Sequence, residues 1–377
     1  MFPWNFNEYN KKGKSKLIRT IIIASGGTGG HISPGIALAE ILIEKQKEIN
    51  FENLMIHSLD RNIDNPDLKE APCKVLWHTT PQFNKNPILF LFKFLYNLLK
   101  TLIKFHKLKV DIVIAMGGYS SLPSIFYAVI FRKRIFLCEQ NRIMGKVNKW
   151  ILPFAEKIAF SLPPVNLPIR KNLQTKIIGN PTRKKIIPEI KTITSKLQIV
   201  SMKEKLNVLV MGGSQGARQI NNMIISLMNH AEISKNFSFR LLTGVSLYDE
   251  ARAKTKKNAE IISYSEDMKS HYEWANLVIA RSGAGVISEC SIFALPMILI
   301  PYPYSADNHQ EENANYFEEH SAAWKISQKD EDISKLLKIL NEIISDRNLL
   351  ALKSESSLTI SKPNAAIETV RFFFHDK

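Results

Sequence analysis

A glycine-rich segment near the N-terminus carries the first residues whose types and spacing could do chemistry. Four of the five residues at 26–30 are glycine, and His31 follows them directly. Glycine lets the backbone adopt positive φ and lets another group approach its N–H donors closely. A helix that begins here would direct its positive end at the same place, which suits an anion. His31, with an ordinary pKa of about 6.5, could act as a general base beside that anion.

A glycine segment by itself also fits two other interpretations. One is a tight strand-to-helix turn with an incidental histidine, and the other is a nicotinamide-binding loop. A nicotinamide site needs an acidic residue at the end of the next strand, about 20 residues further on. The next apolar run, 54–58, reaches no acidic residue before Asp60, which opens a polar loop. The dinucleotide interpretation is therefore disfavoured.

Similar glycine-rich or polar segments follow other apolar runs along the chain. Each lies where a strand is predicted to end, and the carboxyl ends of parallel strands meet at one edge of a sheet. Backbone N–H groups and helix N-termini at such an edge suit a diphosphate without a metal ion. These segments are Gly117–Ser121, Cys138–Asn141, Gly179–Arg183, Gly212–Ala217, Arg281–Gly285 and Pro303–Gln310.

The elements that must position these segments alternate between strand and helix in both halves of the chain. The pattern runs to about residue 178, turns polar and charged, and starts again at Leu206. A chain of 377 residues is longer than a single core usually supports. The sequence therefore predicts the α/β class, with two Rossmann-like, doubly wound domains at 17–178 and 179–362 that face each other across a cleft.

Charge, cysteine content and motif content narrow the partners and the compartment. The 51 Lys and Arg against 35 Asp and Glu give a net charge of +16, which favours an anionic partner such as acidic lipid or a phosphorylated substrate. We expect no nucleic-acid partner, because the basic residues are not interleaved with aromatic ones. The three cysteines are widely spaced and the run 17–24 is too short for a secretory signal, so a reducing, cytoplasmic compartment is expected.

A metal-dependent diphosphate site usually carries a short Asp-x-Asp motif. In this chain residues 330–332 have that pattern, but they lie in a polar stretch far from every glycine segment. Acidic residues there are typical of the first turn of a helix. We therefore expect neither a metal ion nor a cofactor.

The stretch 88–107 has the most unusual composition in the chain. Thirteen of its first 18 residues are apolar, and Lys93, Lys100, Lys104 and Lys107 fall on one side of a helical wheel. Lysines near the middle argue against a membrane span. Two alternatives remain, a helix buried on most sides and an interfacial helix whose lysines meet anionic headgroups, and we favour the second.

Taken together, these segments resemble those of the MurG-type glycosyltransferases. Enzymes of that family transfer N-acetylglucosamine (GlcNAc) from UDP-GlcNAc to undecaprenyl-pyrophosphoryl-MurNAc-pentapeptide (lipid I), which gives lipid II for peptidoglycan synthesis. The match covers nearly the whole chain after residue 16. Seven motifs occur in the family's order and spacing: Gly26–His31, Gly117–Ser120, Glu139–Asn141, Gly179–Pro181, Gly212–Ala217, Arg281–Glu289 and His309–Ala314.

The resemblance implies a GT-B fold, inversion at the anomeric carbon and no bound metal in the mechanism. It also implies that a C-terminal helix at 363–377 packs back on the first domain. The chain is then expected to be a peripheral protein at the cytoplasmic face of the inner membrane. Its expected partners are UDP-GlcNAc, lipid I and the anionic membrane surface.

The resemblance also assigns expected roles to individual residues. His31 is the expected general base, with phosphate binding as its alternative role and Glu139 as the alternative base. Tyr119 and Asn141, with His31 and Glu139, are expected to face the acceptor and the reaction centre. The other expected substrate-binding residues are Thr28, Gly29 and Gly30 in the glycine loop, Arg183, Ser214 and Gln215 near UDP, Glu289 at the ribose hydroxyls, and His309 and Gln310 at the GlcNAc hydroxyls.

Two positions depart from the family's pattern. Thr182 replaces the usual valine, a change that we expect to be neutral, and the second position is the one before Glu-Gln-Asn, where the family usually has histidine. This chain has Cys138 there, and a thiol is a poor base at pH 7, so the role of that histidine is not carried over.

Two rival functions remain. One is another GT-B nucleotide-sugar transferase with a lipid acceptor, such as a diacylglycerol glucosyltransferase. The other is a non-catalytic nucleotide-sugar-binding module at the membrane. The joint presence of His31, Glu289 and Gln310 argues against the module.

Overall fold

The computed structural model describes residues 17–27, 29–79, 87–166, 173–198, 205–213, 216–228, 230–255, 259–327 and 333–375. The N-terminal half contains β1 (Ile18–Ala24), α1 (Gly29–Glu44), α2 (Gln46–Ile49), β2 (Phe51–Leu59), α3 (Pro66–Lys69), β3 (Lys74–His78), α4 (Pro87–Lys107), β4 (Val110–Ala115), α5 (Leu122–Ile130), β5 (Arg134–Glu139), α6 (Lys146–Ile151), β6 (Lys157–Phe160) and β7 (Gln174–Ile177). The C-terminal half contains α7 (Ile190–Leu197), β8 (Leu206–Met211), α8 (Arg218–Met228), α9 (Ala231–Asn236), β9 (Phe237–Leu242), α10 (Tyr248–Lys254), β10 (Glu260–Ile262), α11 (Met268–Trp274), β11 (Leu277–Ala280), α12 (Ala284–Ile292), β12 (Met297–Leu299), α13 (His309–Glu319), β13 (Ala323–Lys325), α14 (Ile333–Ser345) and α15 (Asn348–Ile360), and α16 (Ala365–Phe374) ends the chain.

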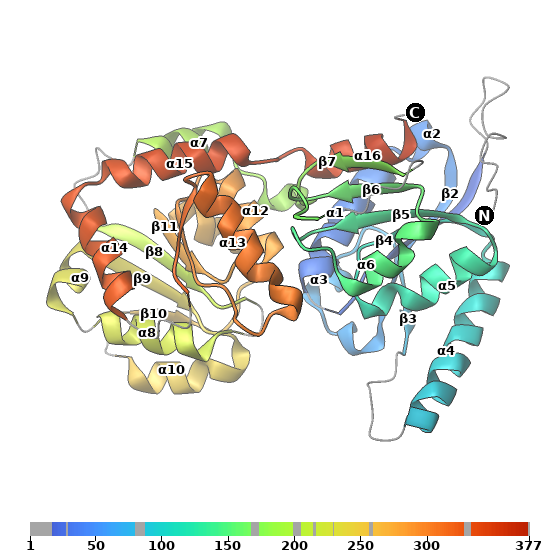
Figure 1. Ribbon diagram of the computed structural model, residues 1–377, viewed down its shortest axis with the longest axis horizontal. Helices are drawn as coiled ribbons and strands as arrows, with labels where there is room; N and C mark the ends of the chain where they lie inside the picture. Colours follow the sequence, from blue (N-terminus) through green and yellow to red (C-terminus); the bar gives the residue numbers. More distant parts are fainter. Residues whose placement is uncertain are drawn as a thin grey trace.

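The N-terminal sheet has seven parallel strands in the order β3-β2-β1-β4-β5-β6-β7 (Figure 1). Its inner strand β1 is rich in β-branched residues, as expected for a parallel strand covered on both faces. Ile21 and Ile23 pack in one core cluster with residues of α1, whereas Ile22 packs in a second cluster with residues of α4 and α5. Successive residues of a strand point to opposite faces, and all three side chains are fully buried because both faces of the sheet are covered.

The C-terminal sheet has six parallel strands in the order β10-β9-β8-β11-β12-β13. The strand order of each sheet reverses once, between β1 and β4 and between β8 and β11. Ligands of open α/β sheets bind at such reversals, beyond the carboxyl ends of the strands. Glycine-rich segments follow all four of these strands, so the topology gathers them at two potential ligand-binding edges.

The last helix, α16, packs on the N-terminal half although it ends the chain. The chain passes from α15 back to the N-terminal sheet, where α16 lies against α1 (Figure 1). The rings of Phe373 and Phe136 stack with their centroids 4.7 Å apart, and the Lys157 ammonium donates to the carbonyl oxygen of Phe372 at 2.8 Å. The chain therefore connects the two halves twice. The domain boundaries at 178 and 362 stay a prediction.

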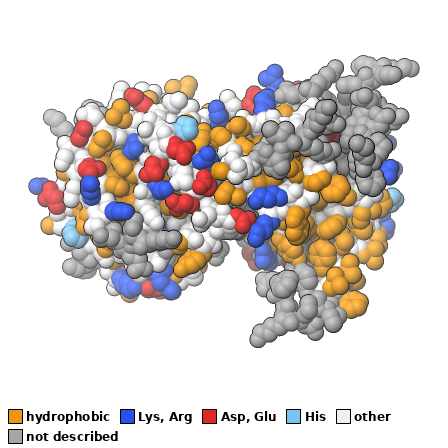
Figure 2. Space-filling view, viewed as in Figure 1, with side chains coloured by type: hydrophobic (Ala, Val, Ile, Leu, Met, Phe, Trp, Pro, Cys, Tyr) orange, Lys and Arg blue, Asp and Glu red, His pale blue; other side chains and the backbone are white. Residues whose placement is uncertain are grey.

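Helix α4 confirms the helix predicted at 88–107, and its two sides differ sharply. Thr101 and Phe105 are buried against the sheet, whereas the opposite side is exposed. Figure 2 shows hydrophobic side chains gathered over α4 and α5 on one end of the molecule. No helix among the described residues is long and apolar enough to cross a membrane. We call the exposed residues the α4 apolar surface: Leu91, Phe92, Leu95, Tyr96, Leu99 and Ile103.

Candidate active site

His31 lies in the first turn of α1 and packs against the glycine loop that follows β4. A Cβ on Gly117 would come within 3.4 Å of its Nε2, and one on Gly118 within 3.3 Å of its Cε1. Both glycines also have positive φ, of 93° and 76°, so a larger residue would be strained there and would crowd the ring. Glycine at these two positions therefore sets the place of the imidazole.

The His31 ring is neutral at ordinary pH. Burial, and next the nearby charge of His309, lower its pKa to about 4. Among the described residues no group hydrogen-bonds to its buried Nδ1. Because His309 begins α13 in the C-terminal half, its influence on His31 also indicates that the two halves approach each other here. A neutral ring with an unused nitrogen can accept a proton.

Glu139, the alternative base, has both carboxylate oxygens engaged. One accepts from the backbone N–H of Asn141 at 3.0 Å, and the other accepts from the N–H of Gly145 and the side-chain amide of Asn148, both at 2.9 Å. Burial raises the pKa of this carboxyl, and the hydrogen bonds oppose the rise. The geometry is that of a residue that holds loop 141–145 in place. It favours His31 over Glu139 as the base.

Cys138, directly before Glu139, is buried in the core of the N-terminal half. Burial raises the pKa of its thiol well above the ordinary value, and the neighbouring Glu139 raises it further. The residue is therefore a neutral thiol and has none of the surroundings that produce a reactive thiolate.

Glu289 lies on α12 in the C-terminal half and is largely buried. The buried Tyr272 hydroxyl donates to its Oε2 at 2.7 Å, and no other described group donates to the carboxyl. Burial raises the pKa of Glu289 to about 7, the Tyr272 hydroxyl lowers it, and the charge of Asp67 in the N-terminal half raises it further. One carboxylate oxygen is thus available to a ligand beside a cluster of N-terminal residues.

Arg183 lies where the chain enters the C-terminal half, and its guanidinium is occupied by carboxylates. It pairs with Glu40 at 3.2 Å, Asp67 at 2.6 Å and Glu70 at 3.4 Å, and the side chain is 6% exposed. Through Asp67 it lies near Glu289. A contact with a nucleotide phosphate, which stays a prediction, would require Arg183 to exchange some of these partners.

The start of α13 is tied to the neighbouring loops of the C-terminal half. The Gln310 side-chain oxygen accepts from the backbone N–H of Tyr302 at 2.9 Å, and its carbonyl oxygen accepts from the Ser282 hydroxyl at 2.7 Å. Asp307 and Asn308, just before His309, have left-handed backbone with φ of 50° and 60°, which is strained for residues with a side chain. Strain of this kind is typical of ligand-binding loops.

The remaining expected residues differ in how far the structure describes them. Tyr119 directly follows Gly118, which lies against His31, and is 42% exposed. A Cβ on Gly29, Gly283 or Gly285 would meet no described atom within 4 Å, so the backbone there is open to a ligand. Gly30 follows Gly29 in the first turn of α1. Thr28, Ser214, Gln215 and the motif at 330–332 lie outside the described residues. Within the described part of the chain, no cluster of three His, Cys, Asp or Glu side chains could hold a metal ion.

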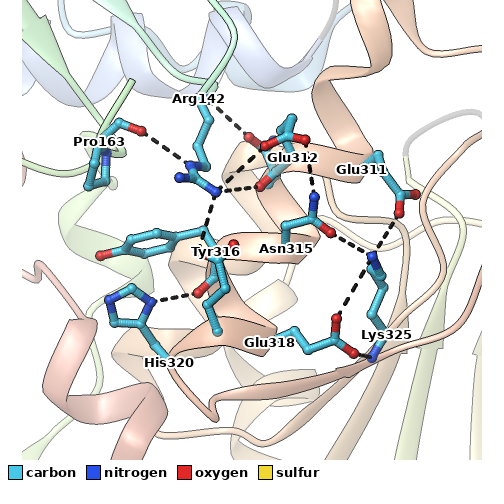
Figure 3. Close-up of polar contacts among 11 residues, drawn as sticks. Arg142, Pro163, Glu311, Glu312, Asn315, Tyr316, Glu318, His320 and Lys325 are labelled. Carbon is cyan, nitrogen blue, oxygen red and sulfur yellow. Dashed lines mark hydrogen bonds and ion pairs between the residues drawn. The ribbon is translucent and has the colours of Figure 1, made fainter. Parts of the chain in front are cut away.

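Polar contacts between residues 141–142 of the N-terminal half and α13 of the C-terminal half join the two halves beside these residues, and we call them the polar seam. The sequence did not predict this connection. Arg142, directly after the Glu-Gln-Asn motif, reaches α13, where its Nη1 lies 3.7 Å from a carboxylate oxygen of Glu312 (Figure 3). It lies at the same distance from a carboxylate oxygen of Glu319. Its Nε donates to the carbonyl oxygen of Pro163 at 3.3 Å. The signal in the sequence was the position of Arg142 next to a motif at the end of a strand.

Two protein-family models match the chain. Residues 21–160 match the glycosyltransferase family 28 N-terminal domain, and residues 207–369 match the glycosyltransferase family 28 C-terminal domain. The chain belongs to glycosyltransferase family 28.

Family 28 relatives of this chain carry a specific name, UDP-N-acetylglucosamine–N-acetylmuramyl-(pentapeptide) pyrophosphoryl-undecaprenol N-acetylglucosamine transferase. The protein of that name from Leptospira interrogans serogroup Icterohaemorrhagiae serovar copenhageni is 54% identical over 357 residues, which are 95% of this chain and 99% of the relative. The one from Francisella tularensis subsp. tularensis is 33% identical and covers 89% of this chain and 92% of its own length. The resemblance to the MurG-type enzymes is confirmed.

Solved structures confirm the GT-B fold of this family 28 chain. The crystal structure of Acinetobacter baumannii MurG has a TM-score of 0.74 at 22% identity and covers 94% of this chain and 98% of its own. A UDP-N-acetylglucosamine 2-epimerase has a TM-score of 0.66 at 12% identity and covers 95% of this chain and 96% of its own. Proteins with different activities share the fold, so the fold alone does not assign the reaction.

Proposed function

We propose that this family 28 chain transfers GlcNAc from UDP-GlcNAc to a MurNAc hydroxyl of lipid I, with inversion at the anomeric carbon, and so produces lipid II for peptidoglycan synthesis. The observation that carries the proposal is the 54% identity that extends over 95% of the chain to a transferase of that name. Two observations support it. His31 follows β1 and Glu289 lies on the helix after β11, next to the two reversals of strand order, and each is influenced by a charged group of the other half, His309 and Asp67 respectively.

The C-terminal half holds the donor in this proposal. The Glu289 carboxylate accepts hydrogen bonds from the ribose hydroxyls, and His309 and Gln310 contact hydroxyls of GlcNAc. Backbone N–H groups after β8 and β11, with the N-terminal end of α12, stabilise the negative charge that develops on the leaving UDP. The open backbone at Gly283 and Gly285 supports this placement.

The N-terminal half supplies the acceptor side and the base. As the MurNAc hydroxyl oxygen bonds to the anomeric carbon, the bond from that carbon to the UDP oxygen breaks and the hydroxyl proton passes to His31. The low pKa of His31 keeps the ring unprotonated at neutral pH, and the negative charge that develops on the leaving diphosphate makes the ring a stronger proton acceptor during the reaction. A neutral ring is also a weaker phosphate ligand than a cationic one, which favours the base over the alternative role.

The membrane contact is a further part of the proposal, because the acceptor is tethered to a lipid. The α4 apolar surface is continuous with exposed Phe126 and Ile130 on α5, and Phe94 joins the two helices with its ring 6.1 Å from that of Phe126. Exposed Lys93 and Lys100 lie on the same helix. Apolar side chains bordered by lysines are typical of a surface that docks on anionic headgroups at the cytoplasmic face of the inner membrane.

Transfer of labelled sugar from UDP-GlcNAc to a lipid I analogue tests the proposed reaction. UDP-glucose serves as the competing donor, and a diacylglycerol as the competing acceptor. We expect transfer of GlcNAc to the lipid I analogue and little product in the other combinations. Transfer from UDP-glucose to diacylglycerol, or binding of UDP-GlcNAc without transfer to either acceptor, would overturn the proposal.

A further inference from the structure

The seam between the two halves contains a side chain with no role in the proposed reaction so far. Asn313 lies on α13 and is completely buried. Its side-chain nitrogen donates to the side-chain oxygen of Asn141 and to the carbonyl oxygen of Ser282, both at 3.0 Å. Its side-chain oxygen accepts from the backbone N–H of Arg142 at 3.1 Å. One carboxamide therefore uses both donors and its acceptor to bridge the two halves.

The two partners of Asn313 in the N-terminal half, Asn141 and Arg142, belong to a loop that is connected through hydrogen bonds to residues near the proposed base. The backbone N–H of Asn141 is held by Glu139, whose other oxygen is bound by Asn148. The side chains of Asn148 and His31 both lie against Gly117, since a Cβ there would come within 3.3 Å of the first and 3.4 Å of the second. Loop 141–145 and His31 thus share one packed group of residues.

Ser282, the partner of Asn313 in the C-terminal half, is hydrogen-bonded to a residue that is proposed to contact the sugar. The Ser282 hydroxyl donates to the carbonyl oxygen of Gln310, the residue expected to contact GlcNAc. Asn313 itself lies one helical turn after His309 and Gln310 on α13. Its carboxamide therefore lies between the group of residues around His31 and the residues expected to hold the donor sugar.

The other contacts of the seam, which are ion pairs, constrain the relative position of the two halves less. The carboxylates of Glu312 and Glu319 lie 3.7 Å from Arg142, and the Glu319 side chain is 60% exposed. Ion pairs that are long and partly exposed contribute little and tolerate movement. The hydrogen bonds of a buried carboxamide with three partners are directional. Each one that is broken leaves a buried polar group without a partner, which destabilises the arrangement.

We propose that Asn313 is a positioning residue, which fixes loop 141–145 of the N-terminal half to loop 281–283 of the C-terminal half. It thereby sets the distance between the proposed base and the donor sugar. The inference rests on the proposed function. Its physical basis is that small displacements of reacting groups lower the rate of the chemical step strongly, while the binding of each separate substrate is little affected.

The first test compares Asn313→Ala with Asn315→Ala on the same helix. Asn315 is a matched control, because its side-chain partners among the described residues are Glu312 at 3.1 Å and Lys325 at 2.5 Å, both in the C-terminal half (Figure 3). Asn313→Ala should lower kcat by about 10- to 100-fold and leave the UDP affinity within about threefold, whereas Asn315→Ala should stay near the parent in both. Equal kcat for the two variants, or a collapse of UDP affinity in Asn313→Ala, would overturn the inference.

A second variant, Asn313→Asp, nearly keeps the volume of the side chain, so it tests the same hydrogen bonds if Asn313→Ala does not fold. In Asn313→Asp the carboxylate faces the oxygens of Asn141 and Ser282 and can donate to neither until it is protonated. The ratio of its kcat to that of the parent should therefore rise as the pH is lowered from 8 to 5.5. A ratio that does not change with pH would contradict the role of the donated hydrogen bonds.

Small-angle X-ray scattering separates this inference from the proposed function. If the parent transfers no GlcNAc, the proposed function fails, but the bridge can still be judged from the shape of the molecule. Asn313→Ala should increase the radius of gyration in the absence of substrates, and Asn315→Ala should not. An unchanged radius in both variants would show that Asn313 does not hold the halves together.

Discussion

Replacing Glu289 with Gln should separate the stability of the C-terminal half from its capacity to bind the donor. Glu289 accepts a hydrogen bond from the Tyr272 hydroxyl and is largely buried. Glutamine has a similar shape and can accept the same hydrogen bond, but it cannot ionise. The variant therefore removes a buried charge with little change in packing.

The effect on stability follows from the raised pKa. Burial moves the pKa of Glu289 from 4.5 to about 7 in the folded chain. Between these values the native state keeps a proton that the unfolded state releases, so the free energy of unfolding falls as the pH rises through this window. A rise of this size corresponds to about 3 kcal/mol above pH 7. Glu289→Gln should therefore increase the free energy of unfolding by up to about 3 kcal/mol at pH 8 and hardly at all at pH 4, measured by urea denaturation.

The effect on donor binding should have the opposite sign. The ribose hydroxyls are expected to donate to the ionised carboxylate, and hydrogen bonds to a charged group contribute about 1.5–3 kcal/mol. Glu289→Gln should thus weaken UDP-GlcNAc binding about 10- to 150-fold at pH 8. The parent should lose about tenfold in affinity between pH 8 and pH 6, because its carboxylate becomes protonated, whereas the variant should show no such dependence.

Calorimetric titration at both pH values provides the measurement, with UDP-GlcNAc rather than UDP because its diphosphate does not titrate in this range. Tyr272→Phe serves as a control, since loss of that hydroxyl should raise the pKa of Glu289 further and move the pH dependence upwards. Glu289→Gln that is no more stable than the parent at pH 8 would refute the raised pKa. Equal donor affinity in the variant and the parent would refute the ribose contact.

Three further predictions concern the base, the departure from the family pattern and the membrane. His31→Ala should lower kcat by about 10²–10⁴-fold with UDP affinity nearly intact. The kcat/KM profile of the parent should show an acid limb near pH 4 from this histidine, below the limb near pH 7 that comes from Glu289; weak UDP binding with normal turnover at saturation would make His31 a phosphate ligand instead. Cys138→Ser should keep most activity, because the thiol is buried and neutral; loss of turnover in a folded variant would contradict this. Replacing Lys93, Lys100 and Lys104 with Gln should weaken binding to anionic vesicles about a hundredfold, at about 1 kcal/mol for each lysine, with activity on a water-soluble acceptor retained; vesicle binding equal to that of the parent would show that the membrane contact lies elsewhere.

Local patterns in the sequence determined the fold class, the family and the main elements. A parallel strand covered on both faces must be apolar along its length, so the run at 17–24 predicted a strand, and β1 confirms it. The glycine segment and the amphipathic run after it predicted the loop and α1. Glycine residues that permit positive φ and apolar residues that recur with a helical period are both visible in a short stretch of sequence. The apolar and lysine stripes of 88–107 predicted α4 for the same reason.

The tertiary structure decided what the side chains of the site contact. Arg183 was expected at the nucleotide, yet its guanidinium binds Glu40 of α1, Asp67 of α3 and Glu70 directly after α3, which lie more than 110 residues away in the chain. Glu139 was a candidate base, and only the path of loop 141–145 shows that both its oxygens are engaged. Asn313 belonged to a recognised motif, but its bridge to Asn141 spans 172 residues. No local pattern encodes such partners, because they depend on how two separately folded sheets are placed against each other.

The charge states of the site also belong to the tertiary structure. The ordinary pKa of histidine suggested a base that titrates near neutral pH, whereas burial and a histidine of the other half lower the pKa of His31 to about 4. In the same way, burial and Asp67 of the other half raise the pKa of Glu289 to about 7. The residue types came from the sequence, but their pKa values depend on how much water the whole fold excludes and on which charges it brings near, and both are properties of the assembled molecule.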